Sequence, residues 1–306
     1  MNITVVIPTK GRPTELCDAL RSIAQQTVPV AQVIVVDASP QAADPGALQQ
    51  FLETAGSPIE FIYQWESKTT GLTVHRNVAI PLARGDVIQF LDDDAELAPD
   101  YFSRLLPVFA DPAVGGAAGW IIDPAIGRRR LKRWFWRLFY WGAFRQRREE
   151  LFLSQPRGLS PTNVLPGVSA YRRTVFDDLR FDEALPGAGV GEDIEFSFRV
   201  GRRWRLYIEP SARLFHHSSP VERQSLRRNI ADKVAFYHYH FRKNMPGRPL
   251  EWAAYGWLNF GLLLDAAVRW RPEAWLGWYE GWHRILERGL IYRPAARGMS
   301  QKYRSR

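Results

Sequence analysis

The sequence has only one cysteine, Cys17, among its 306 residues. A single thiol excludes an internal disulfide framework and a cysteine-based zinc site, and such scarcity is typical of a reducing compartment. No stretch of about eighteen apolar residues is free of charge, so we expect no membrane-spanning helix. The segment after Met1 lacks the basic start and the cleavage site of a secretory signal peptide, and we expect none. The chain also has no internal repeat and no low-complexity tract.

Acidic residues are scarce in the second part of the chain. Residues 125–306 hold 34 basic and 17 acidic side chains, a formal charge of +17, whereas residues 1–124 hold 7 basic and 15 acidic ones, a charge of −8. The net charge of the whole chain is therefore +9. Nine of the cations, and no acid, lie between Arg128 and Arg148. From composition alone, this segment could equally be a solvated basic face or a surface for an anionic partner.

Short β-branched runs alternate with helical patterns in the first 124 residues. The expected strands are Ile3–Ile7, Val33–Val36, Ile59–Tyr63 and Val87–Leu91, and the helices between them are Pro13–Gln26, Ala47–Thr54 and Thr73–Arg84. Continuous apolar strands separated by helices predict an α/β fold, with a mostly parallel central sheet and helices on both faces. Ligands of such sheets bind beyond the carboxyl ends of the strands. Thr9, Asp37 and residues 92–94 lie there.

The pattern is less regular after residue 124. We expect strands at Ala117–Ile122 and Val168–Tyr171, on either side of a basic aromatic insertion over residues 125–160. A flexible loop over Gly187–Gly191 precedes a helix that ends at Val200, and Leu206–Ile208 is expected to be a strand that ends before Pro210. Beyond residue 221 the chain has the pattern of basic, aromatic, amphipathic helices.

These changes in pattern predict two domains. The first covers residues 1–220, in which residues 1–124 form one half, residues 125–160 are the insertion and residues 161–220 form a second half. The second is a helical, amphipathic region over residues 221–306, in which six of the twelve tryptophans lie between Trp252 and Trp282.

Three consecutive carboxylates, Asp92 to Asp94, follow an apolar strand. Their mutual repulsion is unfavourable without a cation or solvent. They could simply lead into a following helix, where Pro99 and Asp100 fit the first turn. They could instead bind a hard cation, since Mg²⁺ and Mn²⁺ prefer oxygen ligands and often bind one or two carboxylates together with phosphates. A bridging metal would also allow the acidic first half of the chain to hold a diphosphate.

An ordered set of segments resembles family 2 glycosyltransferases over roughly residues 3–217. The segments that resemble the nucleotide-sugar half of the family are Val5–Arg12, Val33–Asp37, Arg76-Asn77 and Phe90–Asp94. The segments that resemble its acceptor-side motifs are Gly167–Arg173 and Gly191–Asp193. The resemblance implies an A-type glycosyltransferase fold and an inverting transfer of a hexosyl or deoxyhexosyl group from a nucleotide-diphosphate sugar.

The same resemblance implies roles for individual residues on the donor side. Residues expected to bind the nucleotide sugar are Pro8, Thr9, Asp37, Arg76, Asp92 and Asp93, with Arg76 suited to an anionic ligand by its fixed charge. Residues expected to bind the metal are Asp92, Asp94 and His216, with Asp94 the more direct ligand. The ion would be Mn²⁺ or Mg²⁺, and an imidazole ligand favours Mn²⁺. It would act as a Lewis acid on the departing diphosphate. Taken alone, His216 and His217 could equally be surface or capping residues.

Glu192 and Asp193 lie where a glycine-rich loop meets a helix. Taken alone, these acids could complement the helix dipole. The resemblance implies that Asp193 is the general base, which takes the proton of an acceptor hydroxyl as that oxygen attacks the anomeric carbon. A single displacement with opposed groups on the two sides of the sugar inverts its configuration.

The resemblance also predicts the partners and the mode of action. Gly201-Arg202-Arg203-Trp204 matches the Gln-x-x-Arg-Trp motif of processive members only in part, so we expect a non-processive enzyme that adds one sugar. The expected donor carries UDP, with dTDP and GDP as alternatives, and the expected acceptor is a lipid-linked or envelope glycan. Two other functions stay open: a metal-dependent nucleotidyltransferase, and a non-catalytic basic binding module that retains the fold.

The basic segment Arg128–Arg148 interleaves its cations with seven aromatic residues. Such a segment could bind nucleic acid, pack against the domain as an amphipathic helix, or lie in a membrane interface with Arg at anionic headgroups. One helical face is shared by Leu131, Trp134, Phe135 and Leu138, whereas Trp136, Phe139 and Tyr140 lie off it. Apolar residues thus lie around most of the helix, which favours a cytoplasmic protein bound peripherally to an anionic membrane surface. Nucleic acid is the least expected partner.

Overall fold

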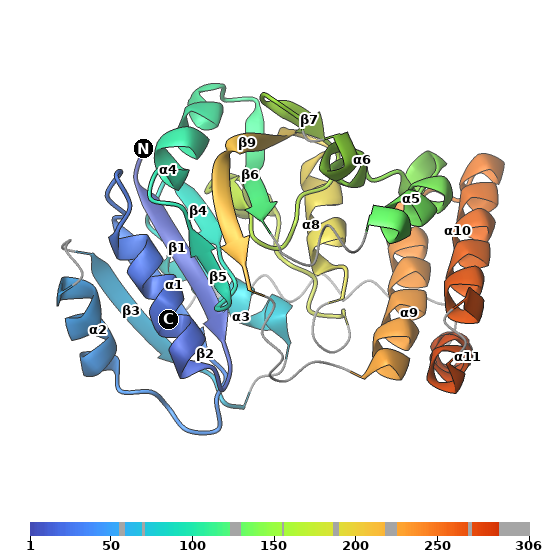
Figure 1. The fold of residues 1–306 in the computed structure, drawn as a ribbon, viewed down its shortest axis with the longest axis horizontal. Coiled ribbons are helices and arrows are strands. Elements are labelled where there is room, and N and C mark those ends of the chain that lie inside the picture. Colours follow the sequence, from blue (N-terminus) through green and yellow to red (C-terminus); the bar gives the residue numbers. More distant parts are fainter. Residues whose placement is uncertain are drawn as a thin grey trace. The chain divides into compact units, whose positions relative to one another are not determined.

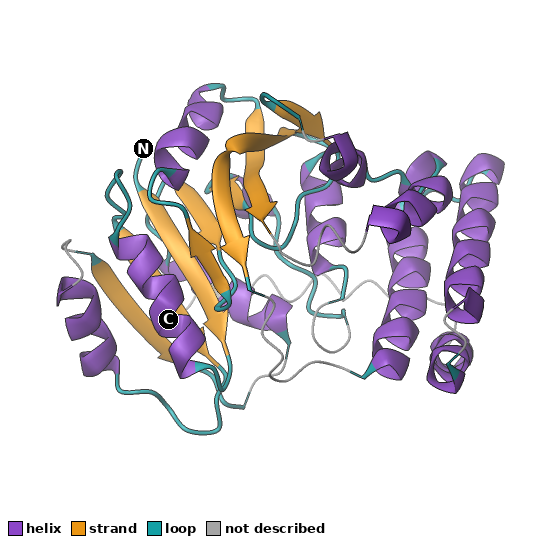
Figure 2. Ribbon diagram, in the orientation of Figure 1, coloured by secondary structure: helices purple, strands orange, loops and turns teal. Residues whose placement is uncertain are grey.

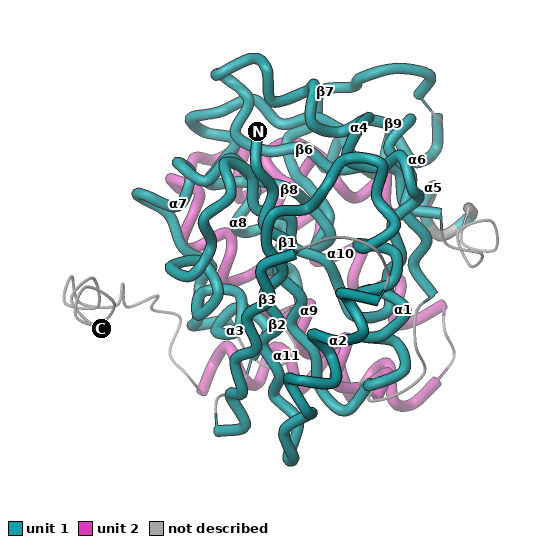
Figure 3. The backbone as a smooth tube through the Cα atoms, turned by 90° about the vertical axis from the view of Figure 1, so that its left-hand side faces the viewer, with its two compact units in different colours: residues 1–134, 146–223 teal, residues 135–145, 224–306 magenta. Residues whose placement is uncertain are grey.

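The computed structural model describes residues 1–54, 59–68, 71–122, 130–154, 156–185, 190–217, 225–268 and 271–287. The chain divides into two compact units, one of residues 1–134 and 146–223 and the other of residues 135–145 and 224–306 (Figure 3). All described strands belong to the first unit, and the described part of the second is helical (Figure 2). The domain limits predicted from the sequence stay a prediction.

The first unit begins with alternating strands and helices (Figure 1). In chain order they are β1 (Ile3–Thr9), α1 (Pro13–Ala24), β2 (Gln32–Asp37), α2 (Pro45–Thr54), β3 (Glu60–Trp65), α3 (Leu72–Ala79), η1 (Ile80–Leu82), β4 (Val87–Phe90), β5 (Ala95–Leu97), α4 (Tyr101–Leu105), η2 (Leu106–Ala110) and β6 (Val114–Ile122). Helix α5 (Arg130–Phe139) then runs from the first unit into the second. The first unit ends with α6 (Arg147–Ser154), β7 (Ser160–Thr162), β8 (Ala170–Arg172), α7 (Val175–Asp178), α8 (Glu192–Val200) and β9 (Arg205–His216).

The described strands form one sheet in the order β3-β2-β1-β4-β8-β6-β9-β5, with β7 paired to β9. Strands β3, β2, β1 and β4 are parallel neighbours, β8 is antiparallel to β4 and β6, and β6 is parallel to β9. Thr9, Asp37 and Trp65 end the first three strands in register. Their side chains therefore share the carboxyl edge of the sheet, where ligands of such folds bind.

Helices cover both faces of this sheet, as predicted. Along β1, Ile3, Val5 and Ile7 join a core cluster that includes apolar residues of α1, α2 and α4. Val6, which points to the opposite face, joins a second cluster that includes residues of α3, α7 and α8. Because successive residues of a strand alternate between faces, a run of apolar residues is buried on both sides. The predicted α/β class, with a mostly parallel part and a helical C-terminal region, is confirmed.

Strand β9 continues past the residue at which the sequence predicted its end. Its pairing with β6 shifts between Glu209, opposite Gly119, and Arg213, opposite Trp120. The three residues between these pairs, which include Pro210, form an irregularity of the bulge type, where the missing N–H of proline breaks no regular ladder. Past this bulge the strand reaches His216, which lies opposite Ala95 of β5.

The second unit is built from helices around an aromatic core. Its elements are the end of α5, η4 (Gly142–Phe144), α9 (Leu226–Asn244), α10 (Pro249–Val268) and α11 (Pro272–Glu287). Phe241 of α9 stacks on Tyr255 of α10 with ring centroids 4.7 Å apart. Helix α11 approaches α9 closely at Gly277, where an added Cβ would lie 2.4 Å from the carbonyl oxygen of Arg227. Among the described residues, no helix is both long and apolar enough to cross a membrane.

Candidate functional site

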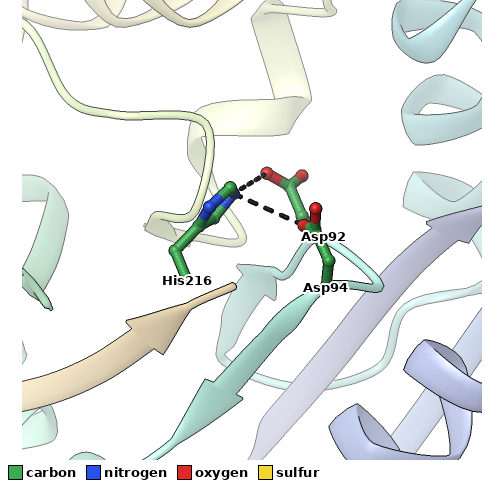
Figure 4. Close-up of side chains that lie close together, drawn as sticks. All are labelled: Asp92, Asp94 and His216. Atoms are coloured by element: carbon green, nitrogen blue, oxygen red, sulfur yellow. Dashed lines mark ion pairs between the residues drawn. The ribbon is translucent and has the colours of Figure 1, made fainter. Parts of the chain in front are cut away.

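Asp92 to Asp94 form the turn between β4 and β5, at the carboxyl edge of the sheet. The imidazole of His216 faces two of these three carboxylates, and its Nε2 lies 3.6 Å from Asp92 Oδ2 and 3.4 Å from Asp94 Oδ1 (Figure 4). The pairing of β5 with β9 produces this proximity, because it places His216 opposite Ala95, the residue after Asp94. The backbone N–H of His217 also donates to the carbonyl oxygen of Asp94 at 2.9 Å.

This group of residues fits a divalent cation. One potential ligand atom from each of Asp92, Asp94 and His216 lies within 4.8 Å of the others. Two ligands of one ion with bonds of about 2.1 Å are separated by at most about 4.2 Å, and both distances from the imidazole already meet that limit. The donor set of two carboxylate oxygens and one imidazole nitrogen suits Mn²⁺, and it accepts Mg²⁺ less readily because of the nitrogen.

Asp93 faces away from this group, toward the β1–α1 loop. Its two carboxylate oxygens accept hydrogen bonds from Thr9 Oγ1 at 2.8 Å and from an Arg12 guanidinium N–H at 2.9 Å. Burial raises the pKa of the Asp93 carboxyl, although both of these hydrogen bonds and the charge of Arg12 act against that rise. Asp93 differs from Asp92 and Asp94 in that it does not pair with His216, although Arg12 also lies 3.7 Å from Asp94 Oδ2. Pro8, which precedes Thr9, is buried within β1.

Arg76 of α3 links the candidate metal ligands to the start of α8. It is 1% exposed, donates to Glu192 Oε1 at 2.8 Å and lies 3.5 Å from Asp92 Oδ1. Phe90 and Phe181 flank its guanidinium, with centroids 5.5 and 5.2 Å from Cζ. Its Nε is buried and has no hydrogen-bond partner among the described residues. Arg76 therefore stands beside the candidate metal site as a buried charge whose partners are carboxylates.

The pKa values of the two carboxyls that flank Arg76 shift in opposite directions. Burial acts to raise the pKa of Asp92, but the hydrogen bond with His216 and the charge of Arg76 outweigh it and lower that pKa. Burial and the charge of neighbouring Asp193 raise the pKa of Glu192 to about 8, against the opposing charge of Arg76. The surroundings of Asp92 thus stabilise its ionised carboxylate, which is the form that binds a cation.

Asp37 ends β2 as predicted and is 3% exposed. Its carboxylate accepts hydrogen bonds from the Tyr63 hydroxyl at 2.6 Å and from the backbone N–H of Ser39 at 2.8 Å. Burial and this contact with Asp37 raise the pKa of Tyr63 to about 12. Trp65, two residues further along β3, donates from its indole to the Ser39 carbonyl at 2.9 Å and stays 46% exposed. A fixed carboxylate beside an exposed indole offers hydrogen bonding and stacking to a flat polar ligand.

Asp193 occupies the first turn of α8, which begins after Gly191. Gly191 has a φ of 82°, a left-handed conformation that glycine adopts without strain. An Arg148 guanidinium N–H donates to Asp193 Oδ2 at 2.5 Å and to the Leu165 carbonyl at 2.8 Å, while the backbone N–H of Ile194 donates to Asp193 Oδ1 at 2.8 Å. The carboxylate is therefore held in a single orientation. Residues 187–189 of the predicted glycine-rich loop lie outside the described residues.

Sequence reasoning assigned no chemical role to three residues that contact the predicted site. Arg12 lies within a motif that was recognised, but its pairing with Asp93 spans the β1–α1 loop and the β4–β5 turn. Tyr63 could have been found by alternation, because it lies on the same side of β3 as Trp65. Arg148 belongs to the basic insertion, and nothing in the sequence signals that it contacts α8.

Part of the chain matches a known family and several curated proteins. The family model described as "Glycosyl transferase family 2" matches residues 4–180. The chain is 33% identical over 152 residues to an N-acetylglucosaminyltransferase of Mesorhizobium japonicum. This match covers 48% of this chain and 34% of that protein. The matches span between 30% and 44% of the lengths of the curated relatives.

Solved structures share the fold at low sequence identity. S. aureus TarS 1-349 in complex with UDP-GlcNAc superimposes with a TM-score of 0.61 at 14% identity, covering 94% of this chain and 81% of that one. The mannosyltransferase PcManGT from Pyrobaculum calidifontis, in complex with GDP-Man and Mn²⁺, gives a TM-score of 0.58 at 18% identity, covering 93% and 80%. The likeness confirms the predicted fold.

Proposed function

The chain belongs to glycosyl transferase family 2, and we propose that it is an inverting, metal-dependent glycosyltransferase that adds one sugar to a lipid-linked or envelope glycan. The observation that carries this proposal is the convergence of Asp92, Asp94 and His216 from two paired strands at the carboxyl edge of the sheet. Asp193 supplies a separate, fixed carboxylate on another element of the same unit.

The proposed donor is a nucleotide-diphosphate sugar. The solved relatives contain UDP-GlcNAc in one case and GDP-Man with Mn²⁺ in another, which supports this class of donor. UDP is the favoured nucleotide, with dTDP and GDP as alternatives. The Asp37 carboxylate accepts hydrogen bonds only, so it suits a base or ribose that presents an N–H or O–H. Pro8 and Thr9 would form the floor of this pocket, because they are buried at the end of the adjoining strand.

Asp92, Asp94 and His216 would hold Mn²⁺ or Mg²⁺ with the donor diphosphate. When bound, such an ion neutralises the charge that develops on the departing diphosphate. Arg76 lies 3.5 Å from Asp92 Oδ1, whereas His216 faces the other oxygen of that carboxylate. Arg12 neutralises Asp93 and thereby reduces the repulsion within the triplet. These two guanidinium groups prepare an otherwise acidic edge for an anionic ligand.

Asp193 is the proposed general base. It would accept the proton of the acceptor hydroxyl while that oxygen forms a bond to the anomeric carbon, and the bond from that carbon to the diphosphate oxygen breaks with its electron pair leaving on the diphosphate. The side chain is 17% exposed, so its carboxylate is partly accessible. Arg148 and the Ile194 N–H orient it, and we assign Arg148 the role of a positioning residue.

We place the protein at the cytoplasmic face of a membrane, bound peripherally. Support comes from the charge of +17 over residues 125–306 and from the exposed aromatic residues of α5 and α10. A lipid-linked acceptor would lie on that surface, so binding there would raise the local concentration of the acceptor.

The test of the proposal separates donor binding from transfer. Purified full-length protein is titrated with UDP, dTDP and GDP, each with Mn²⁺, Mg²⁺ or neither, and the heat of binding is recorded. Release of nucleoside diphosphate from the matching sugar donors is then measured. We expect Asp193→Asn to bind the diphosphate as the wild type does and to release at least about 100-fold less product, since general-base catalysis contributes about 10²–10⁴-fold.

Asp178→Asn is the matched control, because this exposed aspartate of α7 pairs only with Arg203 among the ion pairs of the described residues. It should behave as the wild type in both assays. Binding of no diphosphate under any metal condition would overturn the donor assignment. Full activity of Asp193→Asn would overturn the assignment of the base.

A further inference from the structure

Helix α5 has an inward and an outward apolar face. Trp136 and Phe139 are 8% and 2% exposed and pack in the interior. The opposite face carries a stripe with three- and four-residue spacing, in which Leu131 is 88% exposed and Leu138 is 61% exposed. Trp134 lies within this stripe and Trp141 follows the helix. Internal packing therefore accounts for only half of the apolar residues in this segment, and the rest face outward.

Helix α10 extends this outward apolar face within the second unit. The Trp257 indole donates to the Leu138 carbonyl at 2.8 Å, and the Phe139 ring lies 5.0 Å from the Trp257 ring. Phe260, one turn further on, is 46% exposed, and Val268 at the end of α10 is 71% exposed. We call the exposed residues Leu138, Trp141, Trp257, Phe260 and Val268 the α5–α10 face.

An open hollow lies where α10 ends. It has a volume of about 600 Å³ and is lined by Ala267, Val268, Arg271, Pro272 and Trp275. Four of these five residues are apolar, and the fifth brings a guanidinium to the rim.

Exposed cations lie beside the α5 part of this face. Arg137 and Arg145 are exposed within and just after α5, and no acid occurs between Arg128 and Arg148. The two acids of α10, Glu251 and Asp265, are partly buried. Cations beside exposed Trp, Phe and Leu match the composition of segments that lie at the boundary between anionic headgroups and acyl chains.

We propose that the α5–α10 face is the membrane-binding surface of the protein and that its partner is an anionic lipid bilayer. A second copy of the chain fits less well, because a twofold contact centred on the α5 part of this face would bring Arg137 and Arg145 of both copies together. Nucleic acid fits less well too, because its bases could stack on the aromatic residues of the face but would leave the exposed Leu138 and Val268 without an apolar partner. Trp141 and Trp257 suit the interface, where an indole keeps its N–H near water.

This assignment rests on the proposed membrane location but not on the chemistry, and its test uses neither donor nor acceptor. The single native cysteine allows site-specific labelling: Leu138→Cys or Phe260→Cys is introduced into full-length Cys17→Ser protein and coupled to an environment-sensitive fluorophore. Leu159→Cys is the matched control, because it is 47% exposed and belongs to the first unit. Phosphatidylcholine vesicles with and without phosphatidylglycerol are the probe.

We expect a blue shift at the Leu138 and Phe260 positions with the anionic vesicles only, and none at the Leu159 position. Unlabelled protein should cosediment with the same vesicles and dissociate at about 1 M salt, where the screening length is about 3 Å. Arg137→Ala with Arg145→Ala should weaken binding by about 25-fold, since each cation near an anionic surface contributes about fivefold. This double variant changes only exposed side chains and leaves the apolar face intact. Thermal unfolding checks that it is still folded.

Three results would overturn the proposal. These are the absence of cosedimentation at low salt, an equal shift at all three labelled positions, and a dimer in sedimentation velocity that Leu138→Glu converts to a monomer. Each leaves the binding and transfer assays of the proposed enzyme unaffected, so failure here is distinguishable from failure of the glycosyltransferase assignment.

Discussion

Asp93→Asn and Asp94→Asn are the same substitution at neighbouring positions, yet the structure predicts different consequences. The first should lower the stability of the protein, and the second should lower its affinity for the metal. The carboxylate of Asp93 holds Arg12 and Thr9, with side-chain exposures of 19% for Arg12 and 6% for Asp93. An amide at position 93 can accept only one of those two hydrogen bonds. A hydrogen bond to a charged group contributes about 1.5–3 kcal/mol. Since Arg12 is partly solvated, we expect Asp93→Asn to lower the free energy of unfolding by about 2 kcal/mol.

Asp94→Asn should instead affect the metal. Its Oδ1 lies 3.4 Å from the Nε2 of His216, and a neutral amide replaces a charged oxygen ligand. Loss of a residue that only supports a metal ligand costs about 10–100-fold in affinity. Loss of a direct ligand should therefore cost at least about 100-fold, which is about 2.7 kcal/mol. The unfolding free energy of the metal-free protein should stay nearly unchanged, because the substitution removes repulsion within the triplet together with the long, 3.7 Å ion pair between Asp94 and Arg12.

Two measurements on each variant separate these effects. Calorimetric titration with Mn²⁺ in the presence of UDP reports metal affinity, and thermal unfolding without metal reports stability. We expect Asp93→Asn to lower the midpoint by about 3 °C and to keep Mn²⁺ affinity within about tenfold of the wild type. Asp100→Asn is the control, because this aspartate forms an exposed pair with Arg104. Equal loss of metal affinity in the variants at positions 93 and 94 would refute this distinction between Asp93 and Asp94.

Three further predictions concern other parts of the chain. Arg148→Ala should lower kcat by about tenfold or more with little change in the KM of the donor, and Arg148→Lys should restore part of the lost kcat. A change confined to KM would contradict the positioning role of Arg148. Because the pKa of Glu192 is raised from 4.5 to about 8, the folded state keeps a proton that the unfolded chain has lost. Stability should therefore fall as the pH rises between those values, and Glu192→Gln should flatten this dependence in urea unfolding; an unchanged slope would count against it. Gly277→Ala should destabilise the chain by about 1–3 kcal/mol, because its Cβ would meet the α9 backbone, without loss of UDP binding. Gly256→Ala on α10, where an added Cβ meets nothing within 4 Å, should instead raise the thermal midpoint.

The alternation of strands and helices was predictable because buried parallel strands leave a strong local signal. Continuous apolar runs such as Val33–Val36 admit few other structures once helical patterns flank them. The triplet of aspartates was also predictable as a site, since three adjacent carboxylates need a cation or solvent. His216 was placed beside them through the family resemblance, and the structure brings it there.

The extent of β9 was predicted wrongly, and the reason is a tertiary one. Pro210 normally ends a strand, because it cannot donate to the ladder. The bulge opposite Gly119 and Trp120 accommodates it, and only the fold of the neighbouring strand reveals this.

The orientation of individual side chains was equally inaccessible from the sequence. Asp92, Asp93 and Asp94 carry the same chemistry in the sequence, and their partners come from β1, α3 and β9. Arg148 contacts Asp193 although 45 residues separate them. In the basic segment, periodicity correctly separated Leu131 and Leu138 from Phe139, but burial decides which side faces inward.

The most direct test of the central claim is to locate the metal. Crystals of the full-length protein grown with UDP and Mn²⁺ would be measured at the manganese absorption edge, and an anomalous difference map calculated. We predict one peak bounded by Asp92, Asp94 and His216, about 2.1 Å from a ligand atom of each. A peak elsewhere, or bound UDP with no peak beside these three side chains, would contradict the account.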